Sequence, residues 1–340
     1  MPVHLGFIGG GGIAGAHLDA AKKYGFPVTA LYDINPKTAK RRQEEYHVTH
    51  VLDSAKAVAE HPEVDAVVVC TPQHVHLEGI RAACVAGKPL FTEKPLSRTL
   101  AEAYEAAWLV EKAGIVAQIG FVRRYCPEWG KFKELIEADT IGHPVVWWMA
   151  GGGRGPRSFF TIHEQGGGPM LDGMVHNYDF CRYMWGEPCR VTGSMVTLAP
   201  ENTALDTGTA ILEFPNGNQH TILNSWGMPD GVSSGGFHNV LGPKGIFYFG
   251  DPDNKPPEGL NLKENGYFVV KTAGGTRQVF PYKKWNMYEH QLADFVKKAE
   301  AGDRNTKATI MDGVRAQEIA LAVLGEFGLE ADCDCGCECK

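Results

Sequence analysis

The 340-residue sequence has no long apolar run and no block of basic residues. No stretch approaches the roughly 18 apolar residues that a membrane-spanning helix needs, so we expect no membrane partner. Lysine and arginine total 33 against 40 aspartates and glutamates, a net charge of −7, which argues against nucleic acid as a partner. An apolar strand pattern begins at Val3 with no hydrophobic signal segment before it, so we expect a cytoplasmic protein.

What is present is ordinary for a folded enzyme of two domains. Hydrophobic residues make up 44% and charged residues 21% of the chain, which excludes disorder as its main state. Four of the nine cysteines alternate with acidic residues and glycine in Cys333–Cys339. Thiolates there could bind a soft metal, but the spacing is not the paired C-x₂-C of zinc sites. We therefore predict an acidic, cysteine-rich tail at residues 331–340 and no metal site.

The first 120 residues alternate between two periodicities. Short apolar runs of strand length fall at Val3–Gly9, Val28–Asp33, Ala66–Thr71, Pro89–Glu93 and Val116–Gly120, with a weaker one at His47–Val51. Helical patterns lie between them at Ile13–Lys23, Pro36–Tyr46, Val75–Ala86 and Leu100–Lys112. Apolar strands that alternate with helices predict a parallel sheet covered on both faces. Right-handed crossovers then give a doubly wound α/β domain, which we place at residues 1–121.

From about residue 122 strand patterns follow one another with short connections. They fall at Val145–Gly152, Arg190–Leu198, Thr209–Phe214, Gln219–Gly227, Phe237–Leu241, Ile246–Phe249, Tyr267–Lys271 and Arg277–Phe280. Such a succession predicts a large, mostly antiparallel open sheet. Helical patterns at Met170–Met184, Asn286–Ala301 and Thr309–Glu326 complete a second α/β domain, residues 122–330.

The strongest local signal is the glycine run after the first strand. Gly9 to Ala14 fits G-x-G-x-x-A between a strand and a helix. Gly9 allows a tight turn, Gly11 lets a pyrophosphate approach the backbone, and Ala14 lets the helix pack on the sheet. The pyrophosphate then lies at the helix N-terminus, near Gly12 and Ile13.

Asp33 ends the second strand, 19 residues after Ala14. A carboxylate there accepts hydrogen bonds from the adenosine ribose and repels a 2′-phosphate. We therefore predict NAD rather than NADP as the cofactor. Arg41 and Arg42 could in principle hold a phosphate, but they fall well inside the next helix.

Reactive side chains follow later strands and one glycine hinge. Lys94, in Glu93-Lys94-Pro95, is a charged residue at the end of an apolar strand. Doubly wound sheets bind ligands at such strand ends. The alternative is that Lys94 is a solvated surface lysine. Asp172 and His176 follow three glycines and share a helical face at i, i+4. A histidine paired with a carboxylate suits a general base, and a structural histidine is the alternative.

Together these motifs resemble the glucose–fructose oxidoreductase, inositol dehydrogenase and rhizopine-catabolism (Gfo/Idh/MocA) family. The shared features are the Gly9–Ala14 loop, Thr71-Pro72 with His76, Glu93-Lys94-Pro95, and the glycines that lead to Asp172 and His176. The likeness extends to about residue 326, so the cysteine-rich tail is not part of the family pattern.

The resemblance implies a Rossmann domain, a substrate-binding and oligomerisation domain, and dimers or tetramers joined through the C-terminal sheets. It implies that Lys94 stabilises the reacting oxygen, that His176 takes the hydroxyl proton, and that Asp172 binds substrate and orients the base. Residues implied to border the nicotinamide are Thr71, Pro72, His76, Glu93 and Lys94. Side chains near the predicted mouth, which we expect to bind substrate, include Arg123, Tyr125, Arg154, Arg157 and His163, with Arg124, Trp147, Phe159, Trp226 and His238 as further polar or aromatic groups.

The expected reaction is NAD-dependent oxidation of a secondary hydroxyl of a sugar, glycoside or inositol, with C3 of a glucoside as the preferred case. Two alternatives stay open. One is a glycosidase that works through a transient 3-keto sugar and reoxidises NADH in place. The other is an NAD-binding sensor without catalysis, which the presence of Lys94 and His176 disfavours.

Overall fold

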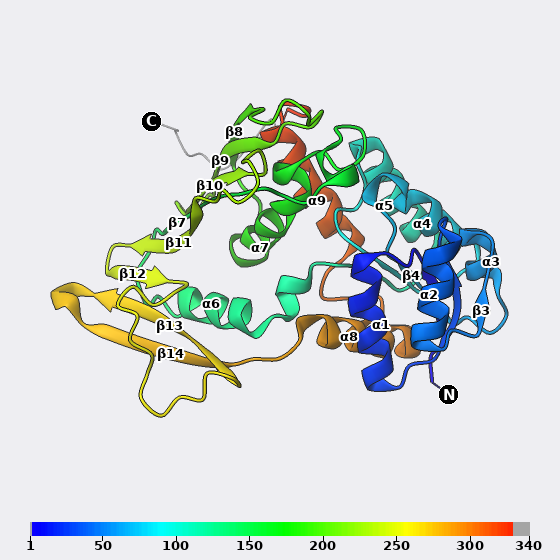
Figure 1. Ribbon diagram of the computed structural model, residues 1–340. Helices are drawn as coiled ribbons and strands as arrows, with labels where there is room; N and C mark the ends of the chain where they lie inside the picture. Colours follow the sequence, from blue (N-terminus) through cyan, green and yellow to red (C-terminus); the bar gives the residue numbers. More distant parts are fainter. Residues whose placement is uncertain (1, 329–340) are drawn as a thin grey trace. The chain divides into compact units, whose positions relative to one another are not determined.

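The structure is a computed structural model and describes residues 2–328, so the cysteine-rich tail lies outside the described residues. The chain forms two compact units (Figure 1). Of the described residues, unit 1 contains 2–125, 164–166 and 286–317, whereas unit 2 contains 126–163, 167–285 and 318–328. Unit 1 is thus built from three separate stretches of sequence. The predicted domains, residues 1–121 and 122–330, are two contiguous stretches.

Unit 1 is built on a six-stranded parallel sheet of order β3-β2-β1-β4-β5-β6, which confirms the predicted doubly wound sheet. Its strands are β1 (Leu5–Ile8), β2 (Val28–Tyr32), β3 (His50–Val51), β4 (Ala66–Val69), β5 (Leu90–Thr92) and β6 (Ala117–Ile119). Its helices are α1 (Gly12–Tyr24), α2 (Pro36–Tyr46), α3 (Ala55–Glu60), α4 (His76–Val85), α5 (Leu100–Ala113) and α8 (Met287–Ala301), with 3₁₀ turns η1 (Gln73–Val75) and η2 (Val122–Tyr125). Helix α9 (Ile310–Val323) begins in unit 1 and ends in unit 2.

The core of unit 1 joins residues that are far apart in the sequence. Phe7 of β1, Leu18 of α1, Phe91 of β5 and Phe295 of α8 are wholly buried in one apolar cluster. Because every strand of this sheet runs in the same direction, the segments that follow β1, β2, β4 and β5 all leave the sheet at one edge. Those segments carry the predicted nucleotide and nicotinamide residues.

Unit 2 is built on an eight-stranded sheet of order β14-β13-β12-β11-β7-β10-β9-β8. Its strands are β7 (Val146–Gly152), β8 (Arg190–Val196), β9 (Thr207–Glu213), β10 (Gln219–Ser225), β11 (Gly235–Gly242), β12 (Gly245–Tyr248), β13 (Asn265–Thr272) and β14 (Arg277–Lys283). Only the β7–β10 pair is parallel among these, so the predicted mostly antiparallel sheet is confirmed.

One face of the second sheet is covered by α6 (Pro127–Glu137) and α7 (Val175–Trp185) (Figure 1). Phe132 of α6 packs edge-on against Trp147 of β7, with ring centroids 5.3 Å apart, and Phe180 of α7 lies against Phe132 at 6.2 Å. Trp147 is wholly buried in this aromatic core. This differs from the prediction that Trp147 lies near the mouth of a substrate site. Shorter turns in this unit are η3 (Ser158–Thr161), η4 (Pro169–Gly173) and η5 (Ala273–Gly275).

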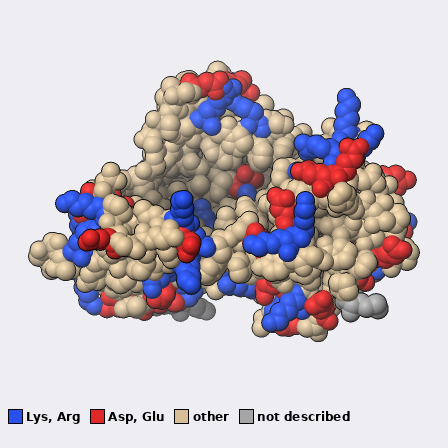
Figure 2. All heavy atoms as spheres, turned by 60° about the horizontal axis from the view of Figure 1, so that its bottom comes forward, with Lys and Arg blue, Asp and Glu red and all other residues tan. Residues whose placement is uncertain are grey.

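Within residues 2–328 no helix combines the length and the apolar character needed to cross a membrane. Over the same residues, no three His, Cys, Asp or Glu side chains are grouped so as to hold a metal ion. Basic and acidic side chains are interspersed over the face drawn in Figure 2.

Candidate functional site

The glycine loop joins β1 to α1 with the backbone that the motif predicts. Gly9 has a φ of +93°, and a Cβ there would lie 2.7 Å from the backbone of Cys70 and Thr71, so only glycine is accommodated. The Gly9 N–H donates to the Tyr32 carbonyl oxygen at 2.7 Å, which fixes the turn beside β2. Ala14 is wholly buried, as close packing of α1 on the sheet requires.

The outer side of the loop is open. Gly11 and Gly12 are exposed, and apart from the adjoining backbone no described residue lies within 4 Å of a Cβ built at either position. Helix α1 begins at Gly12, and Gly11 supplies no side-chain cap for its first N–H groups. Those N–H groups and the positive end of the helix dipole favour an anion. The space and the chemistry therefore fit the pyrophosphate of a dinucleotide.

Asp33 lies beside this loop at the end of β2. Its Oδ2 accepts a hydrogen bond from the Gly10 N–H at 2.7 Å, and its Oδ1 accepts one from the Asn35 N–H at 2.8 Å. These two bonds fix the orientation of a half-buried carboxylate. Each oxygen keeps a further lone pair for a ribose hydroxyl. The placement thus fits the ribose-binding role that we predict for Asp33.

The segment after β4 holds a buried histidine and an orphaned hydroxyl. The His76 ring lies 2.7 Å (Nε2) from the Thr71 carbonyl oxygen and 3.3 Å (Nδ1) from that of Leu96. Burial lowers the pKa of His76, so the ring is neutral at pH 7 and its single N–H donates to one of these two carbonyl oxygens. Thr71 Oγ1 is buried, and no described residue gives it a hydrogen bond. A buried hydroxyl of that kind fits a polar group of a bound ligand.

Glu93 and Lys94 follow β5 and differ sharply in environment. The Glu93 side chain is buried, with Oε1 2.7 Å from His17 Nε2 on α1, and its Oε2 accepts from the Lys94 N–H at 3.0 Å. Glu93 thus ties the strand end to the helix that carries the glycine loop. Between Phe91 and Arg98, Lys94 is the one residue that is not buried. The lysine is therefore held by a rigid neighbourhood and keeps access to solvent.

Asp172 and His176 lie in unit 2, after a glycine hinge. Gly168 has a φ of +82°, and a Cβ there would collide with the Leu205 carbonyl oxygen. The structure differs from the predicted continuous helix, because Asp172 lies in a π-helical turn, Pro169–Gly173, and His176 lies in the first turn of α7. Insertions of this kind are frequent at functional sites. Asp172 is 9% exposed, and His176 is half-buried.

Several of the expected substrate-binding residues already have polar partners. In unit 1 the Tyr125 hydroxyl donates to Asp294 at 2.7 Å. In unit 2 Arg154 pairs with Asp230, Arg157 with Glu201, and the His163 ring lies 3.9 Å from Glu326. Arg123 is half-buried on η2. A substrate that contacts one of the paired residues would have to share that residue with its present partner or displace the partner. The substrate-binding roles of these residues stay predictions.

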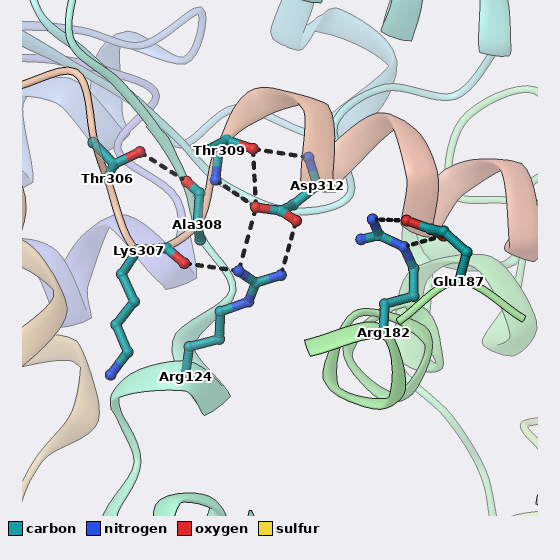
Figure 3. A network of polar contacts seen from close by, with 8 residues as sticks. All are labelled: Arg124, Arg182, Glu187, Thr306, Lys307, Ala308, Thr309 and Asp312. Atoms are coloured by element: carbon teal, nitrogen blue, oxygen red, sulfur yellow. Dashed lines mark hydrogen bonds and ion pairs between the residues drawn. The ribbon is translucent and has the colours of Figure 1, made fainter. Parts of the chain in front are cut away.

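Arg124 is a structural residue rather than a member of the expected mouth (Figure 3). Its guanidinium donates to the Lys307 carbonyl oxygen at 2.7 Å and forms a forked ion pair with Asp312. Thr309, just before α9, donates to the same carboxylate from its N–H at 2.8 Å and from its hydroxyl at 2.9 Å. In unit 2, Figure 3 also shows the separate Arg182–Glu187 pair. The Arg124 network thus joins η2 to residues 307–312 within unit 1.

Two family models match consecutive parts of the chain. Residues 3–121 match a model described as an oxidoreductase family with an NAD-binding Rossmann fold, and residues 129–248 match a GFO/IDH/MocA C-terminal domain. The rhizopine catabolism protein MocA of Rhizobium meliloti is 30% identical over 94% of this chain and 93% of its own length. The myo-inositol 2-dehydrogenase of Thermotoga maritima is 28% identical over 88% of this chain and 89% of its own length.

A solved structure extends this likeness to the fold. The crystal structure of a probable dehydrogenase from Thermotoga maritima is 25% identical, with a TM-score of 0.74, and the match covers 96% of this chain and 97% of that one. The fold and the glycine loop define an NAD-binding oxidoreductase. The chain belongs to the Gfo/Idh/MocA family of these enzymes.

Proposed function

We propose that this protein is an NAD-dependent dehydrogenase that oxidises a secondary hydroxyl of a cyclic polyol or sugar. The observation that carries the proposal is the carboxyl edge of the unit 1 sheet. There the open glycine loop follows β1, Asp33 follows β2, and the accessible Lys94 follows β5. A reactive cation thus stands at the same sheet edge as the site for the cofactor. A nicotinamide cofactor held there would supply the acceptor for a hydride from the carbinol carbon.

The chain's own residues would supply the rest of the chemistry. Lys94 donates a hydrogen bond to the substrate oxygen and stabilises the negative charge that develops on it. His176 accepts the hydroxyl proton, and Asp172 binds a substrate hydroxyl and orients the imidazole. The residues proposed to hold the cofactor are Gly9, Gly11, Gly12, Ile13, Ala14, Asp33, Thr71, Pro72, His76, Glu93 and Lys94. Those proposed to hold the substrate with the three catalytic groups are Arg123, Tyr125, Arg154, Arg157 and His163.

The similarity to a myo-inositol 2-dehydrogenase supports a ring polyol as substrate class, and oxidation at C3 of a glucoside is the preferred sugar case. The test is NADH formation over a panel of inositols, aldoses and glucosides. We expect NADH in proportion to the ketone product with at least one ring polyol. Glycoside cleavage without net NADH would instead establish a redox-cycling glycosidase, and NAD binding without turnover of any panel member would favour the sensor.

We also propose that the protein is a homo-oligomer, a dimer or tetramer joined through the outer face of the unit 2 sheet. The register places Trp148, Thr221 and Ile211 in one row across β7, β10 and β9, on the face opposite buried Trp147. Apolar residues exposed by about two fifths on this sheet are Trp148 (42%), Leu223 (41%), Ile211 (39%), Phe237 (39%) and Leu241 (39%). Several such side chains on one open sheet are typical of an interface.

Replacing Trp148 by glutamate should dissociate the oligomer. The change removes a large apolar anchor and would bury an unpaired carboxylate, so we expect the dissociation constant to rise at least about a hundredfold. Sedimentation velocity over a range of protein concentrations measures this shift. Trp108→Glu is the matched control, because Trp108 is 57% exposed on α5 in unit 1. An unchanged oligomer in Trp148→Glu would place the interface elsewhere.

A further inference from the structure

Arg42 of α2 is buried behind the glycine loop and bonds its backbone. The residue is 8% exposed. Its Nε donates to the Gly10 carbonyl oxygen at 3.0 Å, and its Nη2 donates to the Gly11 carbonyl oxygen at 2.9 Å. Its Nη1 pairs with Glu45 one helical turn along, at 2.9 Å. A single guanidinium therefore holds two consecutive carbonyl groups of the loop.

The neighbouring residues are shaped around this guanidinium. A Cβ at Gly15 would lie 2.9 Å from Arg42 Nη2, so the glycine at that position of α1 leaves room for it. Gly10 is held from both sides, its N–H by Asp33 at 2.7 Å and its carbonyl oxygen by Arg42. The loop backbone is thus fixed by two opposite charges, a carboxylate at the end of β2 and a guanidinium from α2.

The direction of these bonds matters for an anionic ligand. Carbonyl oxygens carry partial negative charge and repel a phosphate, whereas N–H groups attract it. Because Arg42 holds the Gly10 and Gly11 carbonyls on its own side, the open side of the loop is left to Gly11, Gly12 and the first turn of α1. The guanidinium also places a positive charge behind the loop, next to the positive end of the helix dipole.

We propose that Arg42 is a positioning residue of the dinucleotide site, which preorganises the loop for the pyrophosphate without touching it. The same bonds mean that this arginine does not serve as a 2′-phosphate ligand. The inference rests on NAD binding by unit 1 and not on which hydroxyl the enzyme oxidises. It can therefore be tested in the absence of substrate.

The test is a calorimetric titration of the full-length protein with NAD, with ADP and with adenosine. Arg42→Met keeps the length and apolar contacts of the side chain but loses both donors. We expect Kd for NAD and ADP to rise about 10- to 100-fold, because two charge-assisted hydrogen bonds that order the loop are lost. Adenosine, which has no phosphate, should bind within about threefold of wild type.

Three further variants make the outcome decisive. Glu45→Gln removes the outer partner of Arg42 and leaves both loop bonds, so its Kd for NAD should stay within about twofold of wild type. Arg42→Lys keeps the positive charge but cannot bond both carbonyl oxygens. Gly15→Ala leaves Arg42 in the sequence but displaces its guanidinium from the loop. Both variants should therefore lower the affinity for NAD and ADP severalfold or more. These two variants carry the test if Arg42→Met does not fold. Wild-type NAD affinity in the folded variants, or equal loss of adenosine and ADP affinity, would overturn the proposal.

Discussion

Replacing Lys94 or His176 by alanine is expected to lower kcat by at least about a hundredfold. Hydride loss leaves positive character at the carbinol carbon unless the hydroxyl proton departs as well, so the reaction needs a donor to the oxygen and a base for its proton. A positioned base contributes about 10²–10⁴-fold, and an electrostatic donor contributes about as much again. NAD affinity should change much less, since the glycine loop and Asp33 hold the adenosine and pyrophosphate in this account.

The matched controls are exposed or half-exposed residues of the same types. Lys112→Ala on α5 and His50→Ala on β3 should keep wild-type kcat. The oxidation rate should also rise with pH in the wild-type protein, because a base must be neutral to accept a proton, and this dependence should be lost in His176→Ala. Near-wild-type kcat in folded His176→Ala would show that the base lies elsewhere. His163 would then be the next candidate rather than Tyr178, which is wholly buried and whose pKa is raised by that burial.

The second large effect concerns cofactor choice. We expect kcat/KM with NAD to exceed that with NADP on the order of a hundredfold. Asp33 is held by the N–H groups of Gly10 and Asn35, so its carboxylate cannot turn away from a 2′-phosphate without losing both bonds. Arg42, the buried cation of α2, bonds the loop carbonyls and so is not available to neutralise that phosphate.

Steady-state kinetics with both cofactors measures the preference directly. Asp33→Ser should lower kcat/KM for NAD and narrow the ratio to NADP by at least about tenfold. Asp53→Ser, a change at an exposed aspartate near the start of α3, should leave the ratio as it is. Equal kcat/KM for the two cofactors in the wild-type protein would contradict the role given to Asp33.

Local patterns in the sequence predict most of the fold. Apolar strands separated by helices gave the doubly wound sheet, and the eight later strand patterns all correspond to strands of the second sheet. Helix α6 was missed, although Pro127 at its first turn and buried Phe132, Leu135 and Ile136 at helical spacing are a signal that was available. The parallel β7–β10 pair could not be foreseen, because a succession of strands does not say which of them are neighbours.

The site was predictable where a motif is local and unpredictable where distant residues meet. The Gly9–Ala14 loop and Asp33 are separated by a spacing that is typical of dinucleotide-binding domains and can be found in the sequence alone. By contrast, the bond between His17 and Glu93 joins residues 76 positions apart, and Arg42 reaches Gly10 over 32. Arginine is expected on the solvent face of a helix such as α2, so only the folded loop reveals what this one holds. The return of α8 to unit 1 is likewise a property of packing and not of periodicity.

The most direct test of the proposed dehydrogenase is the fate of the carbinol hydrogen. The protein is incubated with NAD and an inositol that carries deuterium at its ring carbons, and the reduced cofactor is examined by mass spectrometry. We predict NADH that carries one deuterium, formed in equal amount to the inosose product. Inosose formed with unlabelled NADH, or ring oxidation without any reduced cofactor, would contradict direct hydride transfer from the carbinol carbon.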